Sequence, residues 1–171
     1  MRSVDDDLAE RLDALPDAEA EAELRSCCAS DTWVAEMLRR RPFGSRDSLL
    51  AACDAAFGEL SDGDVEQAVA AHGRIGERPE GQEREAAWSR AEQADALTAD
   101  EVLARRLAEG NREYEAKFGQ VFLVRAAGRS AQQMYDALTQ RLRNDPQTER
   151  AAVRRELAEI TRLRLTRLVS R

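Results

Sequence analysis

Apolar and polar positions along this chain recur with the period of an α-helix almost throughout its length. Apolar residues return three and four positions apart, and short breaks rich in serine, glycine or proline separate the runs. This spacing is typical of amphipathic helices that bury one face against their neighbours. It predicts helices over residues 3–15, 16–29, 32–40, 46–59, 62–72, 82–96, 98–118, 128–143 and 144–171.

Residues at the predicted helix starts support these boundaries. Ser30, Ser45 and Ser61 stand at the beginnings of helical runs, where a side-chain oxygen accepts a bond from an unpaired backbone N–H. Pro16 suits a first helical turn, because the N–H that it lacks would have no partner there. Residues 98–101, TADE, have the spacing of a capping box. Local chemistry therefore agrees with the hydrophobic period.

One short segment departs from the helical period. Residues 119–124, GQVFLV, are apolar and rich in β-branched side chains, which favours an extended segment that crosses the core. A chain of 171 residues can bury a core as one domain. The predicted fold is therefore all-α, a single-domain helical bundle of about eight helices over residues 1–171, with this extended segment.

The overall charge limits the kinds of partner that the chain can have. A formal net charge of −7 repels nucleic-acid phosphates and anionic lipid headgroups. No stretch approaches the ~20 apolar residues that span a bilayer, and the first residues, MRSVDDDLAERL, are acidic where a signal peptide is basic. We therefore expect a cytoplasmic protein that binds no nucleic acid and no membrane.

Metal and cofactor motifs are missing from the sequence. Cys27, Cys28 and Cys53 form no CxxC pair, and His72 is the only histidine, so neither a zinc site nor a disulfide framework is predicted. The cysteines are interpreted as small buried side chains. A Walker loop, a GxGxxG and a GxSxG are also absent. We expect chemistry without a metal and without a cofactor.

A basic residue interrupts the apolar stripe of the last predicted helix. Val153, Leu157, Ile160 and Leu168 share one face, and Arg164 projects from the middle of it. A guanidinium on a core-facing position needs anionic or carbonyl partners, because an unpaired buried charge is costly. Three interpretations remain open: a buried structural ion pair, an arginine whose head reaches solvent, or a pocket residue that grips a carboxylate through two parallel bonds.

A polar triplet lies on the helix predicted over residues 82–96. Ser89, Glu92 and Gln93 stand three and four positions apart, so a hydroxyl, a carboxylate and an amide share one face. The same spacing is common on helix faces that point to solvent. Spacing alone leaves open whether this triplet contacts a ligand or water.

His72 ends a predicted helix and precedes Gly73. A glycine there suits a chain that leaves a helix, and it lets the backbone approach a ligand closely. Histidine is the residue type whose ordinary pKa lies near neutrality, so acid–base chemistry at pH 7 would most easily use it. A single histidine can equally have no catalytic role.

Residues 24–169, which contain these features, resemble the OHCU decarboxylase family. The matching stretches are CCASDTWVAEMLRRRPF, AHGRIGER, SRAEQ, NREYEAKFGQVFLV, AAGRSAQQM and RRELAEITRLRLTRL. The resemblance implies an enzyme that converts 2-oxo-4-hydroxy-4-carboxy-5-ureidoimidazoline (OHCU) to (S)-allantoin and CO2 in urate degradation, with no cofactor. It also implies a small-molecule substrate as the partner, and a homodimer as a possible assembly.

The resemblance assigns roles to residues that match the family's motifs. His72 corresponds to the family's proton donor, and Arg164 to the arginine that holds the substrate carboxylate. The polar triplet corresponds to a helix that contacts the substrate, and backbone groups after KFG to those that bind its ring. The expected catalytic residues are His72, Glu92 and Arg164, and the expected substrate-binding residues are Gly73, Ser89, Gln93, Val121, Phe122 and Leu123.

Two departures from the family pattern bear on this expectation. Gly73 replaces the family's proline, which frees φ and reduces the rigidity of the loop after His72. Gln120 replaces the usual aromatic residue after KFG. The main alternative is a non-catalytic helical domain that keeps the ligand pocket. A second alternative uses residues 150–171 as a basic amphipathic helix for an acidic partner or a membrane, which Glu156 and Glu159 disfavour.

Overall fold

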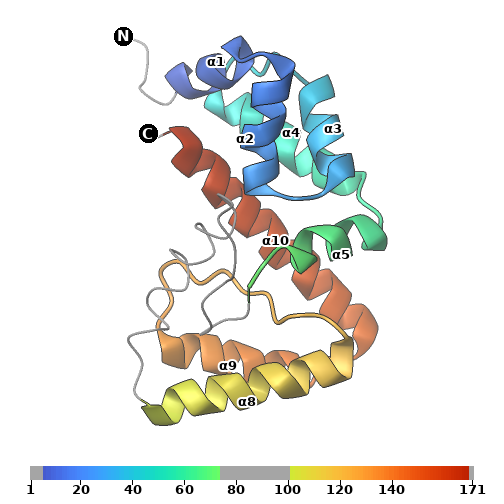
Figure 1. Ribbon diagram of the computed structural model, residues 1–171, viewed down its shortest axis with the longest axis vertical. Helices are drawn as coiled ribbons and strands as arrows, with labels where there is room; N and C mark the ends of the chain where they lie inside the picture. Colours follow the sequence, from blue (N-terminus) through green and yellow to red (C-terminus); the bar gives the residue numbers. More distant parts are fainter. Residues whose placement is uncertain (1–5, 74–100, 170–171) are drawn as a thin grey trace. The chain divides into compact units, whose positions relative to one another are not determined.

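The computed structural model describes residues 6–73 and 101–169, in which eight helices and no strand are found (Figure 1). The all-α prediction is confirmed for these ranges. The residues predicted as a helix over 82–96, and the start of the predicted capping box, lie outside them. The helices are α1 (Asp6–Ala14), α2 (Asp17–Cys27), α3 (Asp31–Arg39), α4 (Arg46–Gly58), α5 (Asp62–Ala70), α8 (Glu101–Phe118), α9 (Ala131–Arg141) and α10 (Pro146–Val169).

The predicted serine caps begin α3, α4 and α5. The Oγ of Ser30 accepts the Trp33 N–H at 3.2 Å, and the Oγ of Ser45 accepts the Ser48 N–H at 3.1 Å. Ser61 caps α5 by accepting the Asp64 N–H at 3.1 Å. Each cap satisfies a backbone donor that has no partner within the first turn of its helix.

One helix boundary of the second half of the chain differs from the predicted one, and another agrees with it. Helix α9 begins at Ala131, not at Gly128, because the Ser130 side chain accepts the Gln133 N–H and the Gln133 side chain accepts the Ser130 N–H. Helix α8 ends as predicted before Gly119, which has a φ of 73°, a conformation that favours glycine. Residues 119–124 then run without regular secondary structure.

The folded chain divides into two compact units. One consists of Met1–Ala68 with Ala158–Arg171, and the other of Val69–Leu157. Helices α5 and α10 each contribute residues to both units. The single-domain organisation expected from length stays a prediction, and each unit is described by itself.

In the unit formed by the N-terminal helices, α2 packs on α3, α3 on α4, and α4 on α1. Trp33 is completely buried, and its ring lies 6.3 Å from that of Phe57, centroid to centroid. All three cysteines are free and buried, as predicted. Burial raises the pKa of the Cys53 thiol to about 12, so this side chain behaves as a small hydrophobic residue at neutral pH.

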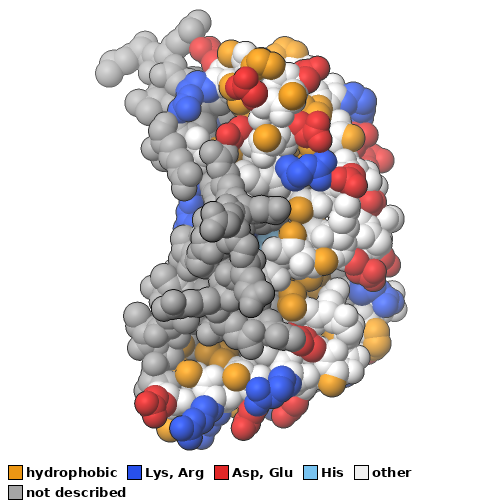
Figure 2. Space-filling view, viewed as in Figure 1, with side chains coloured by type: hydrophobic (Ala, Val, Ile, Leu, Met, Phe, Trp, Pro, Cys, Tyr) orange, Lys and Arg blue, Asp and Glu red, His pale blue; other side chains and the backbone are white. Residues whose placement is uncertain are grey.

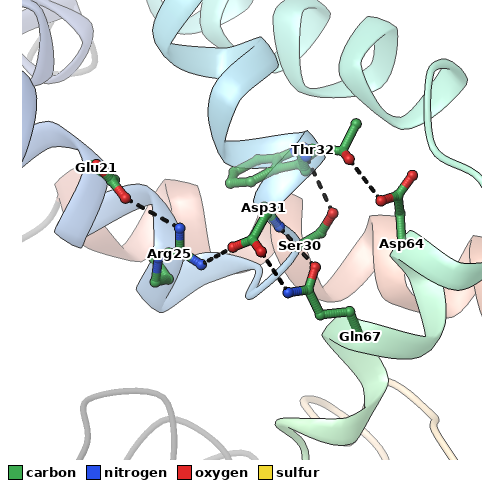
Figure 3. A network of polar contacts seen from close by, with 8 residues as sticks. Glu21, Arg25, Ser30, Asp31, Thr32, Asp64 and Gln67 are labelled. Carbon is green, nitrogen blue, oxygen red and sulfur yellow. Dashed lines mark hydrogen bonds and ion pairs between the residues drawn. The ribbon is translucent and has the colours of Figure 1, made fainter.

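A polar network in the same unit holds α5 against the turn between α2 and α3 (Figure 3). The Asp31 N–H donates to Gln67 Oε1 at 3.0 Å, and Gln67 Nε2 donates back to Asp31 Oδ2 at 2.8 Å. Thr32 Oγ1 donates to Asp64 Oδ1 at 2.6 Å. The bond from Gln67, together with the guanidinium of Arg25, lowers the pKa of Asp31. The helix that leads to His72 is therefore anchored near its start.

In the other unit, α8 packs against α9 (Figure 1). Tyr114 is completely buried, and its ring centroid lies 4.7 Å from that of Phe118 and 5.3 Å from that of Phe122. These contacts bring the extended segment into the core, as its apolar sequence predicts. The buried cluster consists of Leu107, Tyr114, Phe122, Val124, Ala126, Ala131, Met134 and Leu138.

Close packing of α8 on α9 makes Gly110 a sensitive position. A Cβ there would lie 2.5 Å from Leu138 Cδ2 and 3.2 Å from Leu138 Cγ, and Leu138 is completely buried. Gly110→Ala gains helix propensity of about 1 kcal/mol, but overpacking costs about 1–3 kcal/mol. We expect a net loss of stability in urea unfolding. Gly63→Ala in α5, whose Cβ would meet only Ser61 Oγ at 3.7 Å, is the matched control, and equal effects of the two substitutions would contradict this prediction.

The face of the described residues that Figure 2 shows mixes charged, apolar and other side chains. Acidic and basic side chains are interspersed over the face shown in Figure 2. Among the described residues, Val102 is the only large apolar side chain that is exposed. Within the same ranges, no helix has the length and apolar character needed to cross a membrane.

Candidate active site

His72 lies just beyond the C-terminal end of α5. Its backbone N–H donates to the Val69 carbonyl at 2.9 Å, and its side chain is buried, with 8% of the residue exposed. The predicted helix extended to His72, whereas α5 ends at Ala70, because the bond to Val69 tightens the last turn. Gly73 follows and is half-buried. Both residues belong to the Val69–Leu157 unit.

Arg164 occupies the core-facing position that the apolar stripe predicts. It is completely buried, as are its neighbours on the stripe, Leu157 and Ile160, whereas Leu168 is half-buried. Because Arg164 is 0% exposed, the interpretation that its head reaches solvent is wrong. A structural ion pair and a pocket that grips a carboxylate remain as interpretations.

The surroundings of Arg164 include the end of α2. Its Nη1 donates to the Cys27 carbonyl at 3.5 Å. Burial raises the pKa of the Cys27 thiol, and the nearby guanidinium of Arg164 partly opposes that rise.

The segment that contains Val121, Phe122 and Leu123 is fixed at its backbone. The Leu123 carbonyl accepts a bond from Arg141 Nη1 at 3.0 Å. Phe122 and Leu123 are buried, at 2% and 3% exposure, and Val121 is half-buried. The guanidinium of Arg141 also lies over the Phe122 ring, 5.1 Å from its centroid. These residues belong to the same unit as His72.

The expected site is described in part. Ser89, Glu92 and Gln93 lie outside the described residues, so their contacts stay predictions. His72 and the 121–123 segment belong to one compact unit, and Arg164 to the other. That all of these residues line one pocket is therefore also a prediction. Among the described residues, no group of three histidine, cysteine or acidic side chains has an arrangement that could hold a metal ion.

The structure also shows a buried ion pair that sequence reasoning missed. Arg141 and Glu149 are 8% and 1% exposed, and Arg141 Nε donates to Glu149 Oε1 at 2.7 Å. The sequence held a signal that these two side chains face the core, because Arg141 follows the buried Leu138 by three positions and Glu149 precedes the buried Val153 by four. Both charged residues therefore interrupt apolar stripes, in the same way as Arg164.

These features define an all-helical protein with charged residues inserted into apolar helix faces, and comparison with known proteins identifies its class. The profile of the OHCU decarboxylase family matches residues 13–166. The chain therefore belongs to the OHCU decarboxylase family. A relative, the uric acid degradation bifunctional protein TTL of Arabidopsis thaliana, is 33% identical over 153 residues, which are 88% of this chain. This chain spans 47% of that longer protein.

One solved structure agrees with the family assignment, and a second shares the fold. A crystal structure of OHCU decarboxylase in the presence of (S)-allantoin is similar with a TM-score of 0.76 and 30% identity, over 88% of this chain and 99% of that one. A crystal structure of (S)-allantoin synthase has a TM-score of 0.71 at 16% identity, over 94% of this chain and 53% of that one. The second likeness is one of fold alone.

Proposed function

We propose that this chain is a cofactor-independent decarboxylase that converts OHCU to (S)-allantoin and CO2 in urate degradation. The observation that carries the proposal is the completely buried Arg164, at the position of the family's carboxylate-binding arginine, within a family match over residues 13–166. A buried guanidinium suits a substrate whose reacting group is a carboxylate.

The substrate contains the electron sink that such a reaction needs. Its hydroxyl and carboxylate share one ring carbon, and an imine lies next to it. When the bond to CO2 breaks, its electron pair forms a C=C bond to the neighbouring ring carbon, and the C=N π pair moves to the imine nitrogen, which takes up a proton from water. The enol that results becomes the ring carbonyl after its hydroxyl proton departs. A proton added to the neighbouring carbon completes (S)-allantoin. The protein therefore needs to position the carboxylate, move protons and select one face.

Each expected site residue has a part in this sequence of steps. Arg164 holds the carboxylate out of the ring plane, so that the breaking bond overlaps the imine π-system. His72, oriented by Glu92, takes the hydroxyl proton and assists protonation on one face. The backbone of residues 121–123, with Ser89 and Gln93, binds the polar edges of the ring. Gly73 lets the backbone beside His72 approach the substrate.

Circular dichroism of the product tests the activity directly. Urate is converted to OHCU by oxidation with urate oxidase and hydrolysis with hydroxyisourate hydrolase, with and without this protein. The comparison is informative because OHCU decays spontaneously to racemic allantoin. We expect optically active (S)-allantoin to appear rapidly only when the protein is present. An unchanged racemic decay, with (S)-allantoin raising the melting temperature of the protein, would instead support the non-catalytic ligand-binding domain.

We also propose that the protein acts in the cytoplasm. Its three cysteines are free and buried, which suits a reducing compartment where disulfides are not needed for stability. Assembly as a homodimer stays a prediction from the family resemblance, and light scattering of the purified protein measures it directly.

A further inference from the structure

The Arg141–Glu149 pair lies in the Val69–Leu157 unit and is absent from the set of residues that the family resemblance assigns. Arg141 is the last residue of α9, and Glu149 lies in the first turn of α10. Burying two charges costs several kcal/mol for each ion, and replacing such pairs by apolar residues is often neutral for stability. A buried pair of this kind is therefore a candidate for a role beyond stability.

Glu149 is held by donors from three directions. Tyr114 Oη donates to Glu149 Oε1 at 2.5 Å from α8, and Asn144 Nδ2 donates to Oε2 at 2.9 Å from the turn before α10. Burial and the bond to Glu149 raise the pKa of Tyr114, so its phenol stays protonated and keeps donating. With both carboxylate oxygens engaged, Glu149 presents a fixed edge to the guanidinium of Arg141.

The guanidinium of Arg141 connects this fixed carboxylate to the extended segment. Its Nε binds Glu149, its Nη1 donates to the Leu123 carbonyl at 3.0 Å, and its plane lies near the Phe122 ring, 5.1 Å from the centroid. A planar fork can satisfy a carboxylate on one side and a carbonyl on another without changing orientation. The position of Leu123 is thereby set by α8, α9 and α10 together.

A second carboxylate holds the segment two residues further along. The Arg125 N–H donates to Glu156 Oε2 at 2.7 Å, and Glu156 also pairs with Arg129 at 3.7 Å. Within the described residues this segment has no strand partner, so side chains such as Arg141 and Glu156 take the place of the ladder bonds that fix a strand.

We infer that Arg141 and Glu149 are positioning residues, which orient the backbone of residues 121–123 toward the ring of the substrate. The inference rests on the proposed function, since that segment is the expected ring-binding element. The carbonyl of Leu123 is held by Arg141, so the neighbouring backbone groups face the ring in one fixed orientation. Ring orientation decides which face receives the proton, and the pair therefore contributes to the optical purity of the product.

Arg141→Lys separates positioning from stability. Lysine keeps the charge beside Glu149, but a single ammonium cannot reproduce the fork that also reaches Leu123. We expect KM for OHCU, formed in place from urate, to rise about tenfold, which corresponds to roughly one lost hydrogen bond to a charged group. We also expect lower enantiomeric excess of allantoin and weaker binding of (S)-allantoin in calorimetry.

Arg41→Lys is the matched control. The Arg41 side chain is 11% exposed and that of Arg141 10%, and Arg41 likewise binds a carboxylate, that of Asp17, and backbone carbonyls, those of Asp13 and Leu15. A fall in melting temperature is expected in both variants, and a smaller one in Arg41→Lys, because the side chain of Asp17 is 96% exposed and that of Glu149 2%. KM, enantiomeric excess and (S)-allantoin affinity should change only in Arg141→Lys.

The outcomes separate this inference from the proposed function. If the unsubstituted protein is active, and Arg141→Lys resembles Arg41→Lys in KM, enantiomeric excess and (S)-allantoin affinity, the inference is overturned while the function stands. If the unsubstituted protein binds (S)-allantoin without turnover, the function fails, and weaker binding by Arg141→Lys alone still supports positioning. If the unsubstituted protein shows neither turnover nor (S)-allantoin binding, both the inference and the proposed function are overturned.

Discussion

Substitution of His72 by alanine is expected to lower the decarboxylation rate by more than about 100-fold without unfolding the protein. The turn that carries His72 is closed by a backbone bond to Val69 at 2.9 Å, which does not use the imidazole. The side chain is buried, so the proton transfer proposed for it would be shielded from bulk water. Single-turnover rates of (S)-allantoin formation, followed by circular dichroism, measure the loss.

Two further variants test whether the loss of rate in His72→Ala is specific to the proposed site. Glu66→Ala removes an exposed side chain of α5, and it should retain the normal rate and the normal helical spectrum. Glu92→Ala should match the loss in His72→Ala, because the carboxylate is expected to orient the imidazole. A near-normal rate in His72→Ala, with the far-ultraviolet spectrum intact, would remove His72 from the catalytic residues.

The starts of α3, α4 and α5 were predictable because their causes are local. A serine at the N-cap and the residue that it caps are three positions apart, as in the Ser30, Ser45 and Ser61 caps. Helix ends were less predictable. The end of α5 at Ala70 depends on a tightened turn at His72, which competes with one more helical turn at little difference in energy.

Long-range polar contacts were beyond the reach of periodicity. The hydrophobic stripe predicted that Arg164 faces the core, and its complete burial confirms this. Periodicity has no means of naming partners on other elements, such as the Cys27 carbonyl for Arg164. The partners of Arg141 and Glu149 were harder still to predict, since they come from α8, α9, α10 and the extended segment, and periodicity describes one helix at a time.

Replacement of Arg164 by methionine is expected to lower kcat/KM for OHCU by about 30- to 5,000-fold, because truncating one side of a buried charge pair costs about 2–5 kcal/mol. The kcat/KM of Arg164→Lys should lie between those of the unsubstituted protein and Arg164→Met, since lysine supplies the charge but not two parallel bonds. Methionine fills a similar volume, so most of the packing of this completely buried position is retained. Rates are therefore compared per folded molecule, with the fraction folded taken from urea unfolding.

The affinity for (S)-allantoin distinguishes the two remaining interpretations of Arg164. The product lacks the carboxylate that the substrate carries, so a residue that grips this group should matter for OHCU and hardly at all for (S)-allantoin. We expect Arg164→Met to bind (S)-allantoin within about threefold of the unsubstituted protein. A structural ion pair predicts a loss of stability with a normal rate per folded molecule. Equal losses in kcat/KM and in (S)-allantoin affinity would mean that Arg164 shapes the site as a whole, and that the carboxylate is held by another group.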